Sequence, residues 1–171
     1  GLGSARAESS ESGHETSTLA LTGKVKPKRD KTFVETRQGY FKKSAQEHLD
    51  ALVRCARDPK CSGLDEPLPL HVCSQFRSHK KQKYRWLERM QEWRWIQDPS
   101  LRVEYVSRFL AVPGSSRHHW GTDVDIHSLE PTDFQSGKGA EVLTWLREHG
   151  ADFGFVEVYT DDSTRTGYQP E

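Results

Sequence analysis

Three segments of the chain carry apolar residues at the spacing of an amphipathic helix. The first begins at Ser44, which has Glu47 three positions later as in a capping box, and it ends near Pro59. The second covers Lys80 to Ile96, and the third covers residues 138–149 with Gly150 placed as its C-terminal cap. The apolar positions are Leu49, Leu52, Val53 and Ala56 in the first helix, Tyr84, Trp86, Leu87, Met90, Trp93 and Trp95 in the second, and Val142, Leu143 and Leu146 in the third.

Alternating apolar and polar residues predict strands at residues 68–76, 122–127 and 153–159. In the middle strand, Val124 and Ile126 lie on one face, and Asp123 and Asp125 lie on the other. Helices and short strands are interspersed without a repeated βαβ order. The pattern therefore favours an α+β fold.

The N-terminal part of the chain is polar. Residues 1–18 contain mostly Gly, Ser, Glu and Thr and predict a flexible leader, because they bury too little apolar surface to offset their ordering entropy. Irregular structure is expected for residues 19–40, where Gly23 and Pro27 interrupt a lysine-rich segment. We expect one domain over residues 19–171.

Composition excludes some classes of partner. The 25 Lys and Arg residues balance the 25 Asp and Glu residues, so no overall charge attracts nucleic acid or an anionic membrane. No apolar run reaches the length of a membrane span. The three cysteines are neither a disulfide framework nor a paired zinc motif, although Cys55 and Cys61 flank a turn and could form a bridge, and Cys73 resembles a buried strand residue.

The stretch from Ser116 to Asp125 contains the strongest candidate for chemistry. It places adjacent histidines and two aspartates around Gly121, between a Pro-Gly break and a predicted strand. Zinc accepts imidazole nitrogen and carboxylate oxygen, and a hydrolytic zinc keeps one position open for water, so a third protein ligand must come from elsewhere. Isolated histidines and aspartates of this kind are more often ordinary surface or core residues, and the pattern alone does not choose between the two histidines.

The pattern Ser116-x-His118-x-x-Gly121-x-x-x-Asp125 resembles the SxHxxGxxxD signature of the zinc D-alanyl-D-alanine carboxypeptidases and dipeptidases. The resemblance implies that His118 and Asp125 are zinc ligands and that His119 is not. It also implies a hedgehog-type peptidase fold, with a small antiparallel sheet and helices packed around a zinc cleft. Asp123 stands where many members of the family have alanine.

A second segment, from Ser74 to Gln82, is similar to the SxFRSxxxQ motif that precedes the zinc motif in this family. The resemblance implies that Arg77 stabilises the charged substrate or the tetrahedral oxyanion, a role suited to a permanently charged guanidinium. It also places Ser116 and Gln82 among the residues that contact substrate. The assignment of Ser116 to substrate or to bracing of the ligand loop stays open.

The end of the sequence resembles the approach to the family's ExxHW motif, with Glu171 at the position of the general base. The histidine that would be the third zinc ligand falls three residues beyond Glu171. Either the native chain continues to this ligand, which we expect, or the chain is a shortened and inactive form.

These resemblances imply a zinc peptidase that cleaves D-alanine-containing bonds of peptidoglycan stem peptides by zinc-activated water. A monomer in the bacterial periplasm or cell envelope is expected, with no nucleic-acid partner. The alternatives are a catalytically inactive zinc-binding or wall-binding domain of the same fold and an endopeptidase of different bond specificity.

Overall fold

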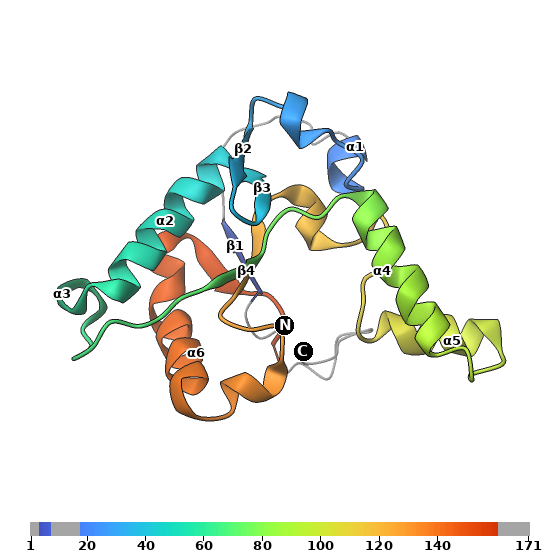
Figure 1. Ribbon diagram of the computed structural model, residues 1–171. Helices are drawn as coiled ribbons and strands as arrows, with labels where there is room; N and C mark the ends of the chain where they lie inside the picture. Colours follow the sequence, from blue (N-terminus) through green and yellow to red (C-terminus); the bar gives the residue numbers. More distant parts are fainter. Residues whose placement is uncertain (1–3, 8–17, 161–171) are drawn as a thin grey trace.

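The computed structural model describes residues 4–7 and 18–160, whose main helices lie at two opposite sides (Figure 1). Helices α2 (Lys43–Arg57) and α6 (Gly137–His149) lie together on one side, and α4 (His79–Glu92) and α5 (Pro99–Ser107) lie on the other. The shorter helical segments are α1 (Thr18–Leu21), η1 (Pro27–Arg29), α3 (Pro59–Ser62), η2 (Arg117–Trp120), η3 (Pro131–Phe134) and η4 (Gly150–Phe153). None of the described helices is long and apolar enough to cross a membrane.

A sheet of short strands lies between these sides. Its strand order is β4-β5-β1-β6, and every neighbouring pair is antiparallel. The strands are β1 (Ser4–Ala7), β4 (Val72–Ser74), β5 (Asp123–Ile126) and β6 (Phe155–Glu157). The expectation of a flexible leader over residues 1–18 does not hold for β1. Main-chain groups make both of its ladders, so a polar sequence without β-propensity can occupy this position.

A hairpin replaces part of the irregular structure expected for residues 19–40. Its strands β2 (Phe33–Thr36) and β3 (Gly39–Lys42) pair in register from Phe33 with Lys42 to Thr36 with Gly39. The Lys42 main-chain N–H donates to the Gly121 carbonyl, so the hairpin is tied to the candidate metal segment.

The hydrophobic core lies between α2, α6 and the sheet. Helix α2 buries a stripe of Ala45, Leu49, Leu52 and Ala56 against β5, α6 and β6, which contribute Val124, Ile126, Val142, Trp145 and Phe155. This confirms the first and third predicted helices. Helix α2 begins at Lys43 directly after β3, however, and no side chain caps its N-terminus, so the expected capping box at Ser44 does not form.

A disulfide joins the end of α2 to α3. Helix α2 ends at Arg57, and the Asp58 carboxylate accepts a hydrogen bond from the Lys60 N–H at the start of α3. Cys55 and Cys61, on either side of this turn, form the bridge that the sequence left open. Cys73 is a half-buried free thiol in β4.

Two predicted strands are shorter than expected. Only Val72–Ser74 pairs within residues 68–76, because Pro67 and Pro69 have no N–H to donate to a ladder. Leu68 and Leu70 are still buried in the core. In the last strand, η4 occupies the beginning of the predicted range and Gly154 turns the chain at a φ of 77°. Gly150 has right-handed helical dihedrals and continues into η4, so it is not a left-handed cap.

The helix predicted from Lys80 to Ile96 stops at Glu92 and is followed by α5, which the sequence pattern did not predict. Asp98 caps α5 by accepting hydrogen bonds from the N–H groups of Ser100 and Leu101. We call residues 79–107 the helical arm. Ring contacts join Trp93 to Tyr105 at 4.5 Å between centroids, so this tryptophan packs within the arm, whereas Trp95 is 63% exposed.

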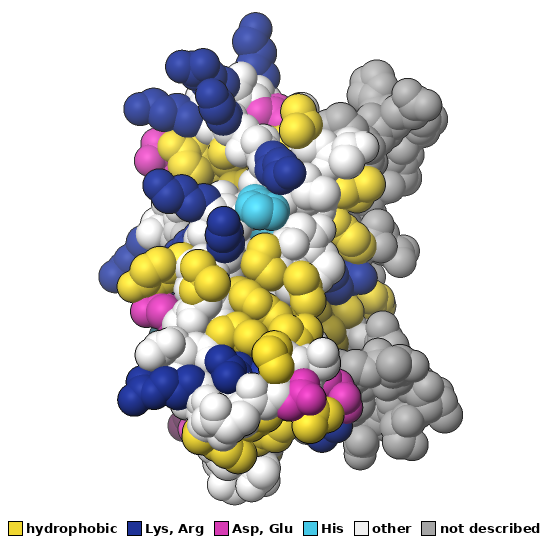
Figure 2. Space-filling model, turned by 90° about the vertical axis from the view of Figure 1, so that its right-hand side faces the viewer, with side chains coloured by type: hydrophobic (Ala, Val, Ile, Leu, Met, Phe, Trp, Pro, Cys, Tyr) yellow, Lys and Arg dark blue, Asp and Glu magenta, His cyan; other side chains and the backbone are white. Residues whose placement is uncertain are grey.

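Figure 2 shows hydrophobic side chains gathered on the outer face of the molecule, with Lys and Arg side chains around them. The exposed large apolar residues within the two arm helices are Tyr84, Leu87, Leu101 and Val103. The arm therefore leaves part of its apolar surface exposed. In its second helix Val106 is buried but Leu101 and Val103 are exposed, and the sequence shows no clear amphipathic period there.

Candidate active site

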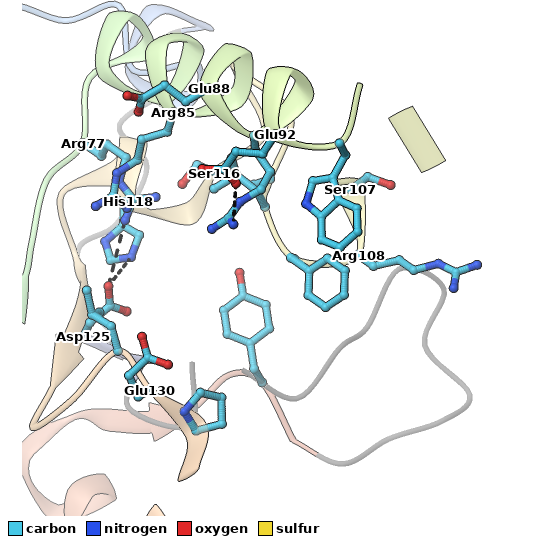
Figure 3. A pocket seen from close by; sticks show the side chains of 18 residues that line it. Arg77, Arg85, Glu88, Glu92, Ser107, Arg108, Ser116, His118, Asp125 and Glu130 are labelled. Atoms are coloured by element: carbon cyan, nitrogen blue, oxygen red, sulfur yellow. Dashed lines mark hydrogen bonds and ion pairs between the residues drawn. The ribbon is translucent and has the colours of Figure 1, made fainter. Parts of the chain in front are cut away.

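His118 and Asp125 face one another at the edge of a cleft. His118 lies on η2, Asp125 lies on β5, and Gly121 reverses the chain between them with a φ of 74°. The His118 Nε2 atom is 3.2 Å from Asp125 Oδ2 (Figure 3), and each residue is 8% exposed. This is the pair that the family resemblance implied.

The tautomer of His118 suits a metal ligand. Its Nδ1 lies 2.8 Å from the main-chain oxygen of Gln75. A carbonyl oxygen only accepts, so Nδ1 carries a proton, and Nε2 is the ring nitrogen that faces Asp125 and would bind a metal. Metal-bound histidines usually donate their second N–H to a carbonyl or carboxylate in this way. The donor set of one imidazole nitrogen and one carboxylate therefore fits zinc.

The Asp125 carboxylate is held in its charged form. Burial raises its pKa, but the hydrogen bond and charge of His118 and the charge of Arg77 outweigh that effect and hold the pKa below its ordinary value. A buried, ionised carboxylate beside an imidazole is the state that a divalent cation requires of its ligands. Among residues 4–7 and 18–160, no group of three or more His, Cys, Asp or Glu side chains is arranged around one metal position.

Arg77 is buried beside the pair. One guanidinium nitrogen donates to Gln82 Oε1 at 2.9 Å, and the other lies 3.5 Å from Ser74 Oγ and 4.0 Å from Asp125 Oδ2. The Arg77 main-chain N–H also donates to the His118 carbonyl at 3.0 Å. The two sequence motifs are thus joined directly, through main chain and side chain.

Gln82 does not face the cleft, contrary to the predicted contact with substrate. Its side chain is fully buried, with the oxygen accepting from Arg77 and the NH2 group donating to the Ala111 carbonyl. Both ends are used within the protein, so this residue orients Arg77. Ser116, in contrast, lines the cleft although it is only 3% exposed, and its predicted contact with substrate stays a prediction.

His119 braces the site from behind. Its Nδ1 donates to the Arg77 carbonyl at 2.6 Å, and its Nε2 accepts from the Gly114 N–H at 3.2 Å. Burial lowers the pKa of His119, and the neighbouring charges lower it further, while the hydrogen bond to Arg77 opposes them. Gly23 lies against this ring, and a Cβ atom there would be 2.3 Å from Nδ1. Both ring nitrogens are engaged, which agrees with the assignment of His118 as the ligand.

An ion pair missed by the sequence argument spans the metal segment. Arg117 Nε lies 2.6 Å from Asp123 Oδ2, and Asp123 is fully buried. The Arg117 guanidinium also lies 4.7 Å from the centre of the Trp120 ring. The pair links the residue before His118 to the strand that carries Asp125. The signals available in the sequence were that both residues lie next to the predicted ligands and that Asp123 stands where many members of the family have alanine.

The cleft itself has a volume of about 730 Å³ and extends from His118 and Asp125 along the helical arm (Figure 3). Pockets of this size accommodate ligands larger than a dipeptide. The walls away from the ligand pair were not found from the sequence. They consist of Arg85, Glu88, Arg89 and Glu92 on α4, Trp93 directly after it, residues 107–111, residues 129–131, and Tyr159. Glu171, the predicted general base, lies outside the described residues.

Comparison with known proteins identifies a family that matches most of this chain. The model of the VanY D-alanyl-D-alanine carboxypeptidase family matches residues 38–171. The D-alanyl-D-alanine carboxypeptidase of Enterococcus faecalis is 33% identical over 102 residues, a match that covers 58% of this chain and 37% of that protein. The chain thus spans little more than a third of this relative's length.

Solved structures of VanY proteins are also similar to this chain. A variant of the vancomycin-resistance D,D-pentapeptidase VanY in complex with Zn(II) is 25% identical, with a TM-score of 0.63 over 86% of this chain and 78% of that chain. VanYB in complex with D-alanine-D-alanine is also 25% identical, with a TM-score of 0.64 over 86% and 77% of the two chains.

The LdcB LD-carboxypeptidase, 20% identical with a TM-score of 0.61 over 83% of this chain and 65% of that chain, shares the fold. These likenesses confirm the predicted α+β, hedgehog-type peptidase fold. The chain belongs to the D-alanyl-D-alanine carboxypeptidase family.

Proposed function

We propose that this protein is a zinc peptidase that removes the terminal D-alanine from D-Ala-D-Ala-containing peptides of the cell wall. The observation that carries the proposal is the ligand pair itself. His118 Nε2 is presented to Asp125 Oδ2 at 3.2 Å, with the opposite ring nitrogen bonded to a carbonyl and Arg77 lying 4.0 Å from the same carboxylate oxygen. The Zn(II) complex of VanY and the D-alanine-D-alanine complex of VanYB support the choice of metal and substrate.

The residues divide the work as follows. His118 and Asp125 hold zinc, with a third ligand from outside the described residues, and zinc when bound supplies Lewis-acid activation of water. Arg77, fixed by Gln82, donates hydrogen bonds to the oxyanion that develops on the scissile carbonyl. Ser116 seats the peptide at the edge of the cleft. The Glu171 carboxylate accepts a proton from the attacking water and returns it to the leaving amine.

The proposed substrate also indicates where the protein acts. A peptidase of wall peptides acts in the periplasm or cell envelope, and we expect it to act there as a monomer. The cleft has room for a stem peptide, which supports a substrate longer than the free dipeptide.

Metal content and product analysis test the proposal. We expect one zinc per chain by mass spectrometry, and release of D-alanine from an N-acyl-D-Ala-D-Ala peptide that stops with a chelator and returns with zinc. His118→Ala should lose both zinc and activity while keeping its far-ultraviolet circular dichroism. His48→Ala, at an exposed position of α2, is the matched control and should keep both.

Two results would contradict it. Stoichiometric zinc without cleavage of any wall peptide would identify a binding domain. Cleavage of an L,D or cross-bridge bond in defined muropeptides, with D-Ala-D-Ala left intact, would identify a different bond specificity.

A further inference from the structure

Arg85 lies in the cleft near the site and has no role in the scheme above. It is on α4, three residues after Gln82, and its side chain is half-buried. It lines the same cavity as Arg77, Ser116, His118 and Asp125. Figure 3 shows it extending from α4 toward the side of the cleft where Arg77 and His118 lie.

The other cleft arginines are already paired. Arg77 is held by Gln82, Ser74 and Asp125. Arg89 forms an ion pair with Glu92 at 2.8 Å, and Arg108 forms one with Glu104 at 3.0 Å. Within the described part of the chain, Arg85 makes no hydrogen bond or ion pair.

Glu88, the acidic residue one turn along α4, forms no ion pair with Arg85, and its carboxylate accepts a hydrogen bond from the Tyr84 hydroxyl. A half-buried guanidinium loses part of its hydration and recovers that free energy only when a partner arrives. Among the described residues no side chain pairs with this guanidinium, so the cleft presents a permanent positive charge to a ligand.

A carboxypeptidase substrate carries two anionic centres in the region of the scissile bond. One is the oxyanion that develops on the scissile carbonyl, and the other is the permanent terminal carboxylate, one residue away and so within about 3.5 Å of chain length. Arg77 is fixed beside the ligand pair and serves the first. A second guanidinium suits the carboxylate, because the planar fork of an arginine matches a carboxylate with two parallel hydrogen bonds.

We propose that Arg85 binds the C-terminal carboxylate of the peptide and so selects chain ends over internal bonds. This inference rests on the proposed function, since it deepens the specificity of the same site. Arg85 thus determines specificity and has a different role from Arg77. Because Arg85 is on α4, the position of this helix sets the distance between the ligand pair and the C-terminus of the bound peptide.

The test compares an acid with its amide. The probes are a ketomethylene analogue of N-acetyl-D-Ala-D-Ala, which has no scissile amide, and the same analogue with a C-terminal carboxamide. Binding of each to the zinc-loaded full chain is measured by calorimetry. We expect the wild type to bind the acid about 10- to 100-fold more tightly than the amide, the range expected for hydrogen bonds to a charged group.

Arg85→Leu should abolish this preference by weakening acid binding alone, and Arg85→Lys should restore part of it. Arg89→Leu, in the same cleft but in an ion pair, is the matched control and should keep the wild-type ratio. If Arg85→Leu fails to fold by circular dichroism, Arg85→Gln replaces it.

An unchanged acid-to-amide ratio in the Arg85 variants, or no preference in the wild type, would overturn the inference. The outcome is separate from that of the proposed function. A wild type that prefers the acid through Arg85 but releases no D-alanine from the hydrolysable peptide would refute the proposed activity and leave this binding role intact.

Discussion

The half of the molecule around α2 and the helical arm use their side chains in opposite ways. Helix α2 buries Leu49, Leu52 and Ala56 in the core, whereas Gln82 is the one fully buried side chain of α4. About half of the large apolar residues of the arm are exposed, and charged residues of α4 line the cleft. The core half therefore supplies most of the stability, and the arm can vary its charges with little effect on folding.

The largest expected effect is in the core. Leu52→Ala should lower the free energy of unfolding by about 2–5 kcal/mol, because Leu52 is completely buried and its removal leaves a cavity. Leu87→Ala is the matched change on α4, where the side chain is 56% exposed, and it should cost less than about 0.5 kcal/mol. Urea unfolding followed by circular dichroism measures both. Equal losses at the two positions would show that the arm belongs to the same core.

Gln82 is the exception within the arm. Gln82→Leu should lower the free energy of unfolding by about 1–3 kcal/mol, because it removes the hydrogen bond that the buried Arg77 guanidinium donates to Gln82 and the one that Gln82 donates to the Ala111 carbonyl. Gln91→Leu, at an exposed position of the same helix, is the control and should have little effect. If both variants unfold at the same urea concentration as the wild type, Gln82 does not anchor the arm to the site.

The disulfide adds stability to the core half. Replacing both Cys55 and Cys61 by serine should lower the free energy of unfolding by about 2 kcal/mol, the value expected for closing so short a loop. Cys73→Ser leaves the bridge intact and controls for the loss of a thiol. Thermal unfolding with and without a reducing agent measures the effect. If the reducing agent leaves the melting temperature of the wild type unchanged, the prediction is contradicted.

The smallest effect is local to the arm. Asp98→Ala removes the cap of α5 and should cost about 1 kcal/mol, seen as faster amide hydrogen exchange in α5 while α2 stays protected. Asp98→Asn keeps a capping oxygen and should restore protection. Faster exchange in α2 as well would mean that the two halves unfold together.

The same comparison explains what the sequence could predict. Helices α2 and α6 were found because each buries one stripe, and burial is what produces a helical period. Helix α5 was missed because Leu101 and Val103 are exposed, so its apolar residues follow no single face. The strand at β1 was missed for a different reason, since its pairing depends on main-chain groups that carry no sequence signal.

In the candidate site, some residues could also be predicted from the sequence and others could not. His118, Asp125 and Arg77 were predicted because the family motifs preserve them at fixed spacing. The burial of Gln82 depends on Ala111, and the pairing of Arg117 with Asp123 depends on the turn at Gly121, so neither follows from spacing alone. Arg85 follows Lys80, Lys81 and Lys83 in the sequence without any motif that marks it, and only the fold places it in the cleft.

Gly23 has a consequence for protein engineering. It packs against the His119 ring and the His79 main chain at a φ of 72°, so any larger residue there both strains the backbone and displaces the brace behind Arg77. In a library randomised at this position and selected for activity, glycine should be the residue recovered. A designer who shortens or fuses the N-terminal segment must therefore keep this loop, although Gly23 does not line the cleft.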